Sequence, residues 1–182
     1  MARRKKKKGK RYCIPLSAIL RNEWEQLNRG GLCVGGVLLV LAAVLCRIAI
    51  GSPYYTRHLL RMPYFMPPTV VLYAVGLLLY FLLGALFGGL CITRSAALMR
   101  ARFKGLTLLV PTALFRLLWY PLFFGACAPA LALISLLLSV FCCLCACRLF
   151  RGNTHIAVML LLIELVWTLL LAAVTLAVLV LN

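Results

Sequence analysis

The chain has 182 residues, of which 65% are hydrophobic and 13% charged, and it carries a formal net charge of +17. Too little polar surface remains to cover so apolar a core in water, which excludes the class of soluble globular domains. A transmembrane β-barrel is excluded as well, because its strands alternate apolar and polar residues whereas the apolar runs here are continuous. The composition therefore predicts an all-α membrane protein.

The N-terminal region, residues 1–31, opens with the sequence MARRKKKKGKRY, which contains eight of the 20 Lys and Arg residues. Basic clusters bind nucleic acid through its phosphates, but beside a membrane span each charge is also attracted to anionic lipid by about 1 kcal/mol. We favour the lipid interpretation, and expect a disordered cytoplasmic tail and no nucleic-acid partner. Residues 13–28, with the sequence CIPLSAILRNEWEQLN, fit a short amphipathic segment that lies along the membrane interface.

Five apolar runs follow, each about 20 residues long and so able to cross a bilayer as a helix. They cover residues 32–50, 69–92, 106–124, 129–147 and 156–181. Because the connections are short, little of the chain remains for a separate soluble domain. We therefore expect residues 32–182 to form one bundle of five transmembrane helices, with the lipid bilayer as its surroundings.

Glycines spaced four residues apart occur in the first two runs, as Gly31 and Gly35 and as Gly84 and Gly88. Small residues at this spacing let two helix backbones approach closely in a membrane. We interpret both pairs as packing sites within the bundle, and keep a homodimer face as the alternative.

The connection between the first two spans, residues 52–68, has the sequence SPYYTRHLLRMPYFMPP, with four prolines and four aromatic residues. Proline restricts its own φ and the conformation of the preceding residue, so this segment cannot run as a continuous helix. We expect a stiff lid over the outer mouth of the bundle.

Positive charges set the orientation, because cytoplasmic loops carry an excess of Lys and Arg. With the N-terminus inside, the inner segments hold the basic tail together with Arg94, Arg100, Arg102, Lys104, Arg148 and Arg151. The outer side keeps Arg57 and Arg61, with Arg47 near the outer end of the first span. We therefore expect an integral protein of a bacterial plasma membrane, with the N-terminus cytoplasmic and the C-terminus outside.

Two charged residues lie deep inside the predicted spans, Arg116 in the third and Glu164 in the fifth. At 1.5 Å per residue both fall at nearly the same depth, where an unpaired charge costs at least about 2.5 kcal/mol. We expect the two side chains to face the bundle interior and to meet. Trp119 shares a helix face with Arg116, and Trp167 shares one with Glu164. This arrangement favours an interior pocket for a flat, largely apolar ligand with a polar group. The alternative is an ion pair that only fixes the helix register.

No metal, cofactor or catalytic site is indicated by the sequence. Four cysteines lie near the end of the fourth span, in the sequence CCLCACR, but one helix cannot direct all four sulfurs at one ion. Small hydrophobic side chains in lipid, or acylation sites at a basic edge, are the better interpretation. The chain contains no aspartate, no nucleophile elbow and no HExxH sequence, so we do not expect an enzyme.

The sequence LFRLLWYPLFFGACAPALALI resembles the third-to-fourth helix junction of the TspO/MBR family, also called translocator proteins, tryptophan-rich sensory proteins or peripheral-type benzodiazepine receptors. The family pattern there is roughly L-x-x-N-x-x-W-x-P-x-F-F-G, and it is matched by Trp119, Pro121, Phe123, Phe124 and Gly125. The sequence LRMPYFMPPTVVLYAVGLLLY is similar to the family's loop-to-second-helix pattern, through Pro63, Phe65, Pro67, Pro68 and Tyr80. In the last span, Trp167 and Asn182 keep the family's separation.

The resemblance implies a five-helix bundle, often a homodimer, with a ligand cavity that opens under the first loop. It also implies binding of porphyrins and other tetrapyrroles, sterols or drug-like molecules. With the buried pair included, the candidate ligand-binding residues are Phe65, Pro67, Pro68, Arg116, Trp119, Tyr120, Glu164 and Trp167.

Several positions depart from the family pattern. Val70 and Gly76 stand where the family has tryptophans, Arg116 replaces a pocket asparagine, and Glu164 replaces a tyrosine of the last helix. Two polar positions have become an oppositely charged pair, which implies a shared cavity whose chemistry has changed.

We therefore predict a TspO/MBR-like protein that takes an amphipathic, anionic small molecule such as a porphyrin into the bundle, for sensing or transport. In this hypothesis Arg116 faces the ligand's acid group, Glu164 holds Arg116 in the empty site, and Trp119, Tyr120 and Trp167 form an aromatic wall. Two alternatives stay open: a proton-coupled transporter in which Glu164 titrates, and a structural protein with a vestigial pocket.

Overall fold

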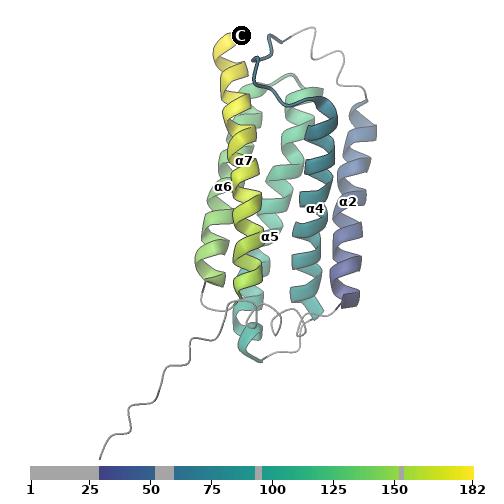
Figure 1. The fold of residues 1–182 in the computed structure, drawn as a ribbon, viewed down its shortest axis with the longest axis vertical. Helices are drawn as coiled ribbons and strands as arrows, with labels where there is room; N and C mark the ends of the chain where they lie inside the picture. The colour runs from purple at the N-terminus through teal and green to yellow at the C-terminus, as the bar shows by residue number, and fades with distance from the viewer. Residues whose placement is uncertain (1–28, 52–59, 93–95, 152–153) are drawn as a thin grey trace, which may run out of the picture.

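The computed structural model describes residues 29–51, 60–92, 96–151 and 154–182, and in residues 92–102 it describes no side chains. Over these residues the chain is helical and contains no strand (Figure 1). The helices are α2 Arg29–Ile50, α4 Thr69–Ile92, α5 Ala96–Tyr120, α6 Pro129–Phe150 and α7 His155–Leu181, and a short π-helix, η1 Pro121–Gly125, continues α5. Five of the described helices are long and apolar enough to cross a membrane.

Three helices extend beyond the apolar runs at one end of the bundle. α2 begins at Arg29, α5 begins at Ala96 and α6 continues to Phe150. The basic residues in these turns lower the hydropathy, but Arg and Lys are good helix formers, so the helices continue past the apolar core of the membrane. Most of the predicted tail, with its interfacial segment, and residues 52–59 of the predicted lid lie outside the described residues.

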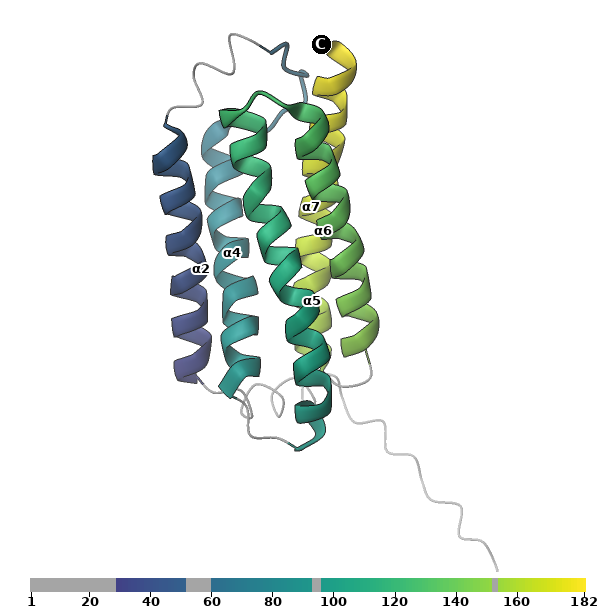
Figure 2. The ribbon, with the colours of Figure 1, turned by 180° about the vertical axis from the view of Figure 1, so that it is seen from behind.

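The five helices run side by side, with α2 at one edge of the bundle and α6 at the other (Figures 1 and 2). α2 contacts α4 far more than any other helix, whereas α6 packs against both α5 and α7. Asn182 lies at the upper end of Figure 1, as do the residues that precede α4, and we call this the C-terminal end of the bundle. The bundle is therefore closely packed around α6 and more open between α2 and α5.

Glycines bring α2 and α4 into direct backbone contact. A Cβ atom added to Gly35 would overlap the carbonyl oxygen of Gly84 and lie 2.9 Å from the Cα of Gly88. A Cβ added to Gly88 would likewise overlap the carbonyl oxygen of Gly31. The prediction that the glycines pack within the bundle is confirmed, since they bring α2 against α4 inside one chain.

The helix geometry changes at Pro121. Proline has no N–H group, so the carbonyl oxygen of Leu117 receives no hydrogen bond from it. The chain widens there into one π-turn, which closes with a hydrogen bond of 2.9 Å from the Ala126 N–H to the Pro121 carbonyl oxygen. This turn carries Phe123 and Phe124 into the core at the C-terminal end.

The core has two apolar clusters separated by polar side chains. One cluster is centred on Leu90, Leu109 and Phe150, and the other lies around Trp119 and Phe123 at the C-terminal end. Between them along the helices lie the fully buried polar residues Thr112, Arg116, Ser139, Glu164 and Thr168. This polar layer contains both charges that the sequence predicted to be buried.

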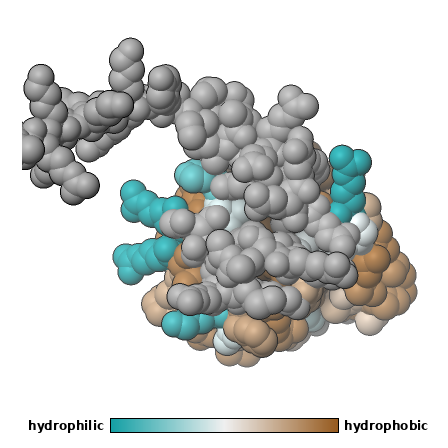
Figure 3. All heavy atoms as spheres, turned by 90° about the horizontal axis from the view of Figure 1, so that it is seen from below, coloured by the Kyte–Doolittle hydropathy of each residue, from teal (hydrophilic) through white to brown (hydrophobic). Residues whose placement is uncertain are grey.

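The outer wall of the bundle is apolar, with large exposed side chains on every helix. From the end where α2 begins, hydrophilic side chains project from a hydrophobic body (Figure 3). The described basic side chains at this end, all exposed, are Arg29, Lys104, Arg148 and Arg151. An apolar belt with charges beyond its end is the surface that a bilayer requires.

Candidate functional site

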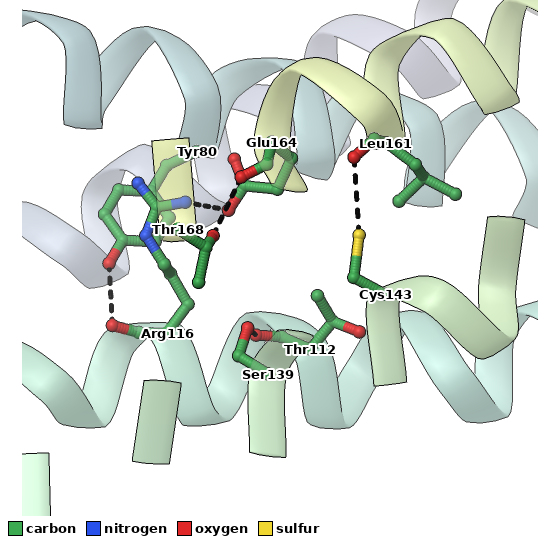
Figure 4. A network of polar contacts seen from close by, with 8 residues as sticks. All are labelled: Tyr80, Thr112, Arg116, Ser139, Cys143, Leu161, Glu164 and Thr168. Carbon is green, nitrogen blue, oxygen red and sulfur yellow. Dashed lines mark hydrogen bonds and ion pairs between the residues drawn. The ribbon is translucent and has the colours of Figure 1, made fainter. Parts of the chain in front are cut away.

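The buried arginine of α5 and the buried glutamate of α7 form an ion pair. Arg116 Nη1 contacts Glu164 Oε1, and the two residues are only 1% and 3% exposed (Figure 4). Their position on adjacent inner faces agrees with the equal depth that the sequence predicts. The predicted contact is therefore present, and each charge compensates the other inside the bundle.

The surroundings of the pair provide few other partners for its charges. The Tyr80 ring centroid lies 5.1 Å from the guanidinium carbon of Arg116, and the Tyr80 hydroxyl donates to the Arg116 carbonyl oxygen at 3.1 Å. Glu164 Oε2 is buried without a hydrogen-bond partner among the described residues, and Glu164 borders a void of about 10 Å³ walled by leucines. The two charges therefore depend mainly on each other, and loss of either member leaves a buried charge uncompensated.

Hydroxyl side chains near the pair bond to helix carbonyls instead of the charges. Thr168 donates to the carbonyl oxygen of Glu164 at 2.8 Å, and Ser139 donates to that of Thr112 at 3.1 Å (Figure 4). The second bond joins α6 to α5 beside the ion pair. These contacts fix the helices that carry the two charges and leave the charges themselves to each other.

A cavity of about 370 Å³ lies between α2, α4, α5 and α7. The residues expected to bind ligand that line it are Arg116, Trp119, Tyr120 and Trp167. Glu164 is not part of this wall and contacts the arginine from behind. The volume lies in the range of small-molecule sites, and the mixture of aromatic side chains with a few polar groups is typical of them.

Three residues expected to bind ligand do not reach this wall. Phe65 is 61% exposed, and neither Pro67 nor Pro68 lines the cavity. From the same segment it is Met62 and Met66 that pack against the cluster around Trp119. The family-like sequence before α4 therefore covers the C-terminal end of the bundle without forming the cavity itself.

The aromatic wall is held in place by specific contacts. Trp119 stacks on Phe123 with ring centroids 5.4 Å apart, and its edge-to-face contact with Phe124 measures 5.9 Å. The Trp119 Nε1–H group donates to Thr175 Oγ1 on α7 at 3.1 Å. With its indole N–H paired, Trp119 presents a fixed apolar face to the cavity.

Sequence reasoning missed Arg47 and Tyr73 as site residues, and both line the cavity. The guanidinium carbon of Arg47 lies 3.3 Å from the ring centroid of Tyr73, and the Tyr73 and Tyr120 hydroxyl oxygens are 2.7 Å apart. The i, i+3, i+7 spacing of Tyr73, Gly76 and Tyr80 on α4 was a signal for a shared face. No pattern within α2 shows which helix Arg47 faces.

A second hollow, of about 410 Å³, lies between α2, α4 and α5 around the glycine contact. Its walls are apolar side chains and glycine backbone, without a charged residue. This composition suits lipid tails, since it contains no group that would select a polar ligand.

Of the four cysteines at the end of α6, Cys143 takes part in helix packing. Cys143 is buried, and its thiol donates to the Leu161 carbonyl oxygen on α7 at 3.4 Å (Figure 4). Within the described parts of the chain, no three His, Cys, Asp or Glu side chains come together as metal ligands would.

The fold and the cavity define an integral membrane protein built as a five-helix bundle with an interior site near its C-terminal end. The sequence model of the TspO/MBR family matches residues 31–181. The chain belongs to the TspO/MBR family. No curated protein matches the chain closely enough to count as a relative.

Proposed function

We propose that this protein binds an amphipathic, anionic small molecule in the cavity between α2, α4, α5 and α7, for sensing or transport across the membrane. The observation that carries the proposal is the cavity itself, which Trp119, Tyr120 and Trp167 line together with two arginines. An ion pair that only fixed the helix register would need no space beside it. Porphyrins, which the family resemblance implies, are the first candidates for the ligand.

Gly76 supports this proposal because it opens the cavity wall. It lines the cavity, and a Cβ atom added to it would meet nothing within 4 Å. The family pattern has a tryptophan at this position, so the chain has exchanged a large aromatic side chain for open volume. We infer that the ligand occupies the space beside Gly76, and that binding, without catalysis, is the function of the site.

The exposed basic side chains at the end where α2 begins favour a cytoplasmic location for that end. The cavity then opens toward the opposite side of the membrane. A homodimer, also implied by the resemblance, has to use a surface other than the glycine faces, since α2 and α4 already occupy these.

A cavity-filling variant tests the proposal. Protoporphyrin IX is titrated into the purified protein in nanodiscs of neutral lipid, and the change in porphyrin absorbance is followed. Gly76→Leu should weaken binding by at least about tenfold, because the new side chain occupies the cavity. Ala74→Leu is the matched control, since Ala74 lies exposed on the same helix, and its affinity should equal that of the parent. Equal affinity in Gly76→Leu and the parent would place any bound porphyrin outside this cavity.

A further inference from the structure

The two arginines that line the cavity differ in what neutralises them. Arg116 is paired with Glu164, as described above. Glu164 is the sole acidic side chain among the described residues, and the chain has only two others, Glu23 and Glu25. Both of these precede α2, whereas Arg47 lies in its last turn. A 22-residue helix is about 33 Å long, so Arg47 lies near the opposite end of α2 from its first residue, Arg29.

Arg47 instead lies against aromatic side chains that carry hydroxyl groups. Its guanidinium lies over the ring of Tyr73, whose hydroxyl is hydrogen-bonded to that of Tyr120. A ring face attracts a cation but does not neutralise it, so the positive charge stays available to an anion. A hydrogen bond between two hydroxyl groups uses one proton, and the accepting hydroxyl keeps its own proton to donate elsewhere.

We infer that Arg47, Tyr73 and Tyr120 form the site that receives the acid group of the cavity's ligand, with the apolar body directed toward Trp167 and Arg116. This inference rests on the proposed function. The sequence predicted that Arg116 contacts the acid group, whereas this inference assigns that contact to Arg47 at the C-terminal end of the cavity. The group bound is a carboxylate or a phosphate on an apolar body, because guanidinium and hydroxyl donors match both.

Arg47 can be removed without opening the core. It is exposed at the end of α2 and makes no ion pair within the described ranges, whereas Arg116 is buried. Arg47→Gln should therefore fold as the parent does, which its thermal unfolding temperature checks. Arg61→Gln is the matched control, since Arg61 is an exposed arginine near the same end and does not line the cavity.

The test compares protoporphyrin IX with its uncharged dimethyl ester in nanodiscs of phosphatidylcholine. Arg47→Gln should weaken binding of the diacid by about tenfold or more, the usual effect of losing a charged hydrogen-bond donor. The ester should bind Arg47→Gln and the parent equally, and Arg61→Gln should bind both ligands as the parent does. Tyr73→Phe, which keeps the ring beneath Arg47, should weaken only the diacid, and by less than Arg47→Gln.

A second set of nanodiscs, with phosphatidylglycerol added, distinguishes a free ligand from a lipid headgroup. If a lipid phosphate occupies the Arg47 site, the anionic lipid weakens binding of the diacid to the parent but not to Arg47→Gln. If the site is reserved for free ligands, the added lipid has the same effect on both proteins. The first result identifies a lipid phosphate as an occupant of the Arg47 site, and the second, together with the weaker diacid binding of Arg47→Gln, identifies a free ligand.

Equal affinities of Arg47→Gln and the parent for diacid and ester alike, in both lipids, overturn the inference and leave binding in the cavity intact. Failure of the parent to bind either porphyrin, or binding that Gly76→Leu does not reduce, contradicts the proposed function itself.

Discussion

The two arginines of the cavity show how differently one side chain acts in two places. Arg116 is 1% exposed and its charge is matched by Glu164, so it forms a buried contact between α5 and α7. Arg47 lies exposed at the end of α2, over a tyrosine ring, and forms no ion pair with any residue that the structure describes. In our proposal the buried charge holds the bundle together, whereas the exposed one is available to a ligand. Whether a charged residue beside a cavity can bind a ligand therefore depends on whether another residue of the chain already neutralises it.

The largest expected effect comes from breaking the buried pair. Glu164→Leu leaves the Arg116 charge uncompensated, and the free energy of unfolding should fall by about 3–5 kcal/mol. Thermal unfolding in detergent micelles, followed by the loss of helical circular dichroism, measures the change. The double variant Arg116→Met with Glu164→Leu should recover most of the loss, because replacing both charges with apolar groups removes the penalty. A single variant as stable as the parent would show that the pair does not hold the bundle together.

Separating α2 from α4 tests whether the Arg47 site depends on their close contact. Gly35→Leu places a side chain against the backbone of Gly84 and Gly88, and overpacking of this kind costs about 1–3 kcal/mol. Because Arg47 is on α2 and Tyr73 is on α4, the preference for the diacid over the ester should also fall. Val37→Leu, on the exposed face of α2, serves as the control and should change neither quantity. An unchanged diacid preference in Gly35→Leu would mean that the anion site does not require this helix contact.

A smaller effect is expected from the tyrosine pair. Tyr73→Phe removes the hydrogen bond to Tyr120 but keeps the ring under Arg47, so affinity for the diacid should fall by about fivefold. The matched control is Tyr64→Phe, because Tyr64 is fully exposed. Titration of both variants with diacid and ester measures the difference. A loss of equal size for the ester would assign Tyr73 to the apolar wall.

The smallest effect concerns the segment before α4. The Asn182 side chain accepts a hydrogen bond from the Arg61 N–H at 2.9 Å and donates to the Arg61 carbonyl oxygen at 3.2 Å, which ties this segment to the end of α7. Asn182→Ala should let the ligand leave about two- to threefold faster, with the Arg116–Glu164 pair unaffected. Stopped-flow dissociation of the bound porphyrin measures the rate. The same dissociation rate in Asn182→Ala and the parent would mean that the segment does not retain the ligand.

Much of the fold, and one half of the candidate site, follow from the sequence. Continuous apolar runs require helices in a membrane, and equal depth with opposite charge made the contact of Arg116 with Glu164 the economical arrangement. The position of Arg47 did not follow, because it depends on how closely the glycines let α2 approach α4 and on how α2 is rotated against it. A pattern within one helix carries no information about that rotation. Phe65, Pro67 and Pro68 matched a family pattern, but the packing of Met62 and Met66 decides which side of their segment faces the core.

The most direct test of the account removes each arginine in turn and measures stability and affinity on the same samples. The account predicts that Arg116→Gln lowers the unfolding temperature strongly, while the proteins that remain folded still bind the diacid more tightly than the ester. Arg47→Gln should keep the unfolding temperature of the parent and lose that preference. The opposite result, with Arg116→Gln abolishing the preference for the diacid and Arg47→Gln leaving it unchanged, would contradict the division between a structural and a ligand-binding arginine.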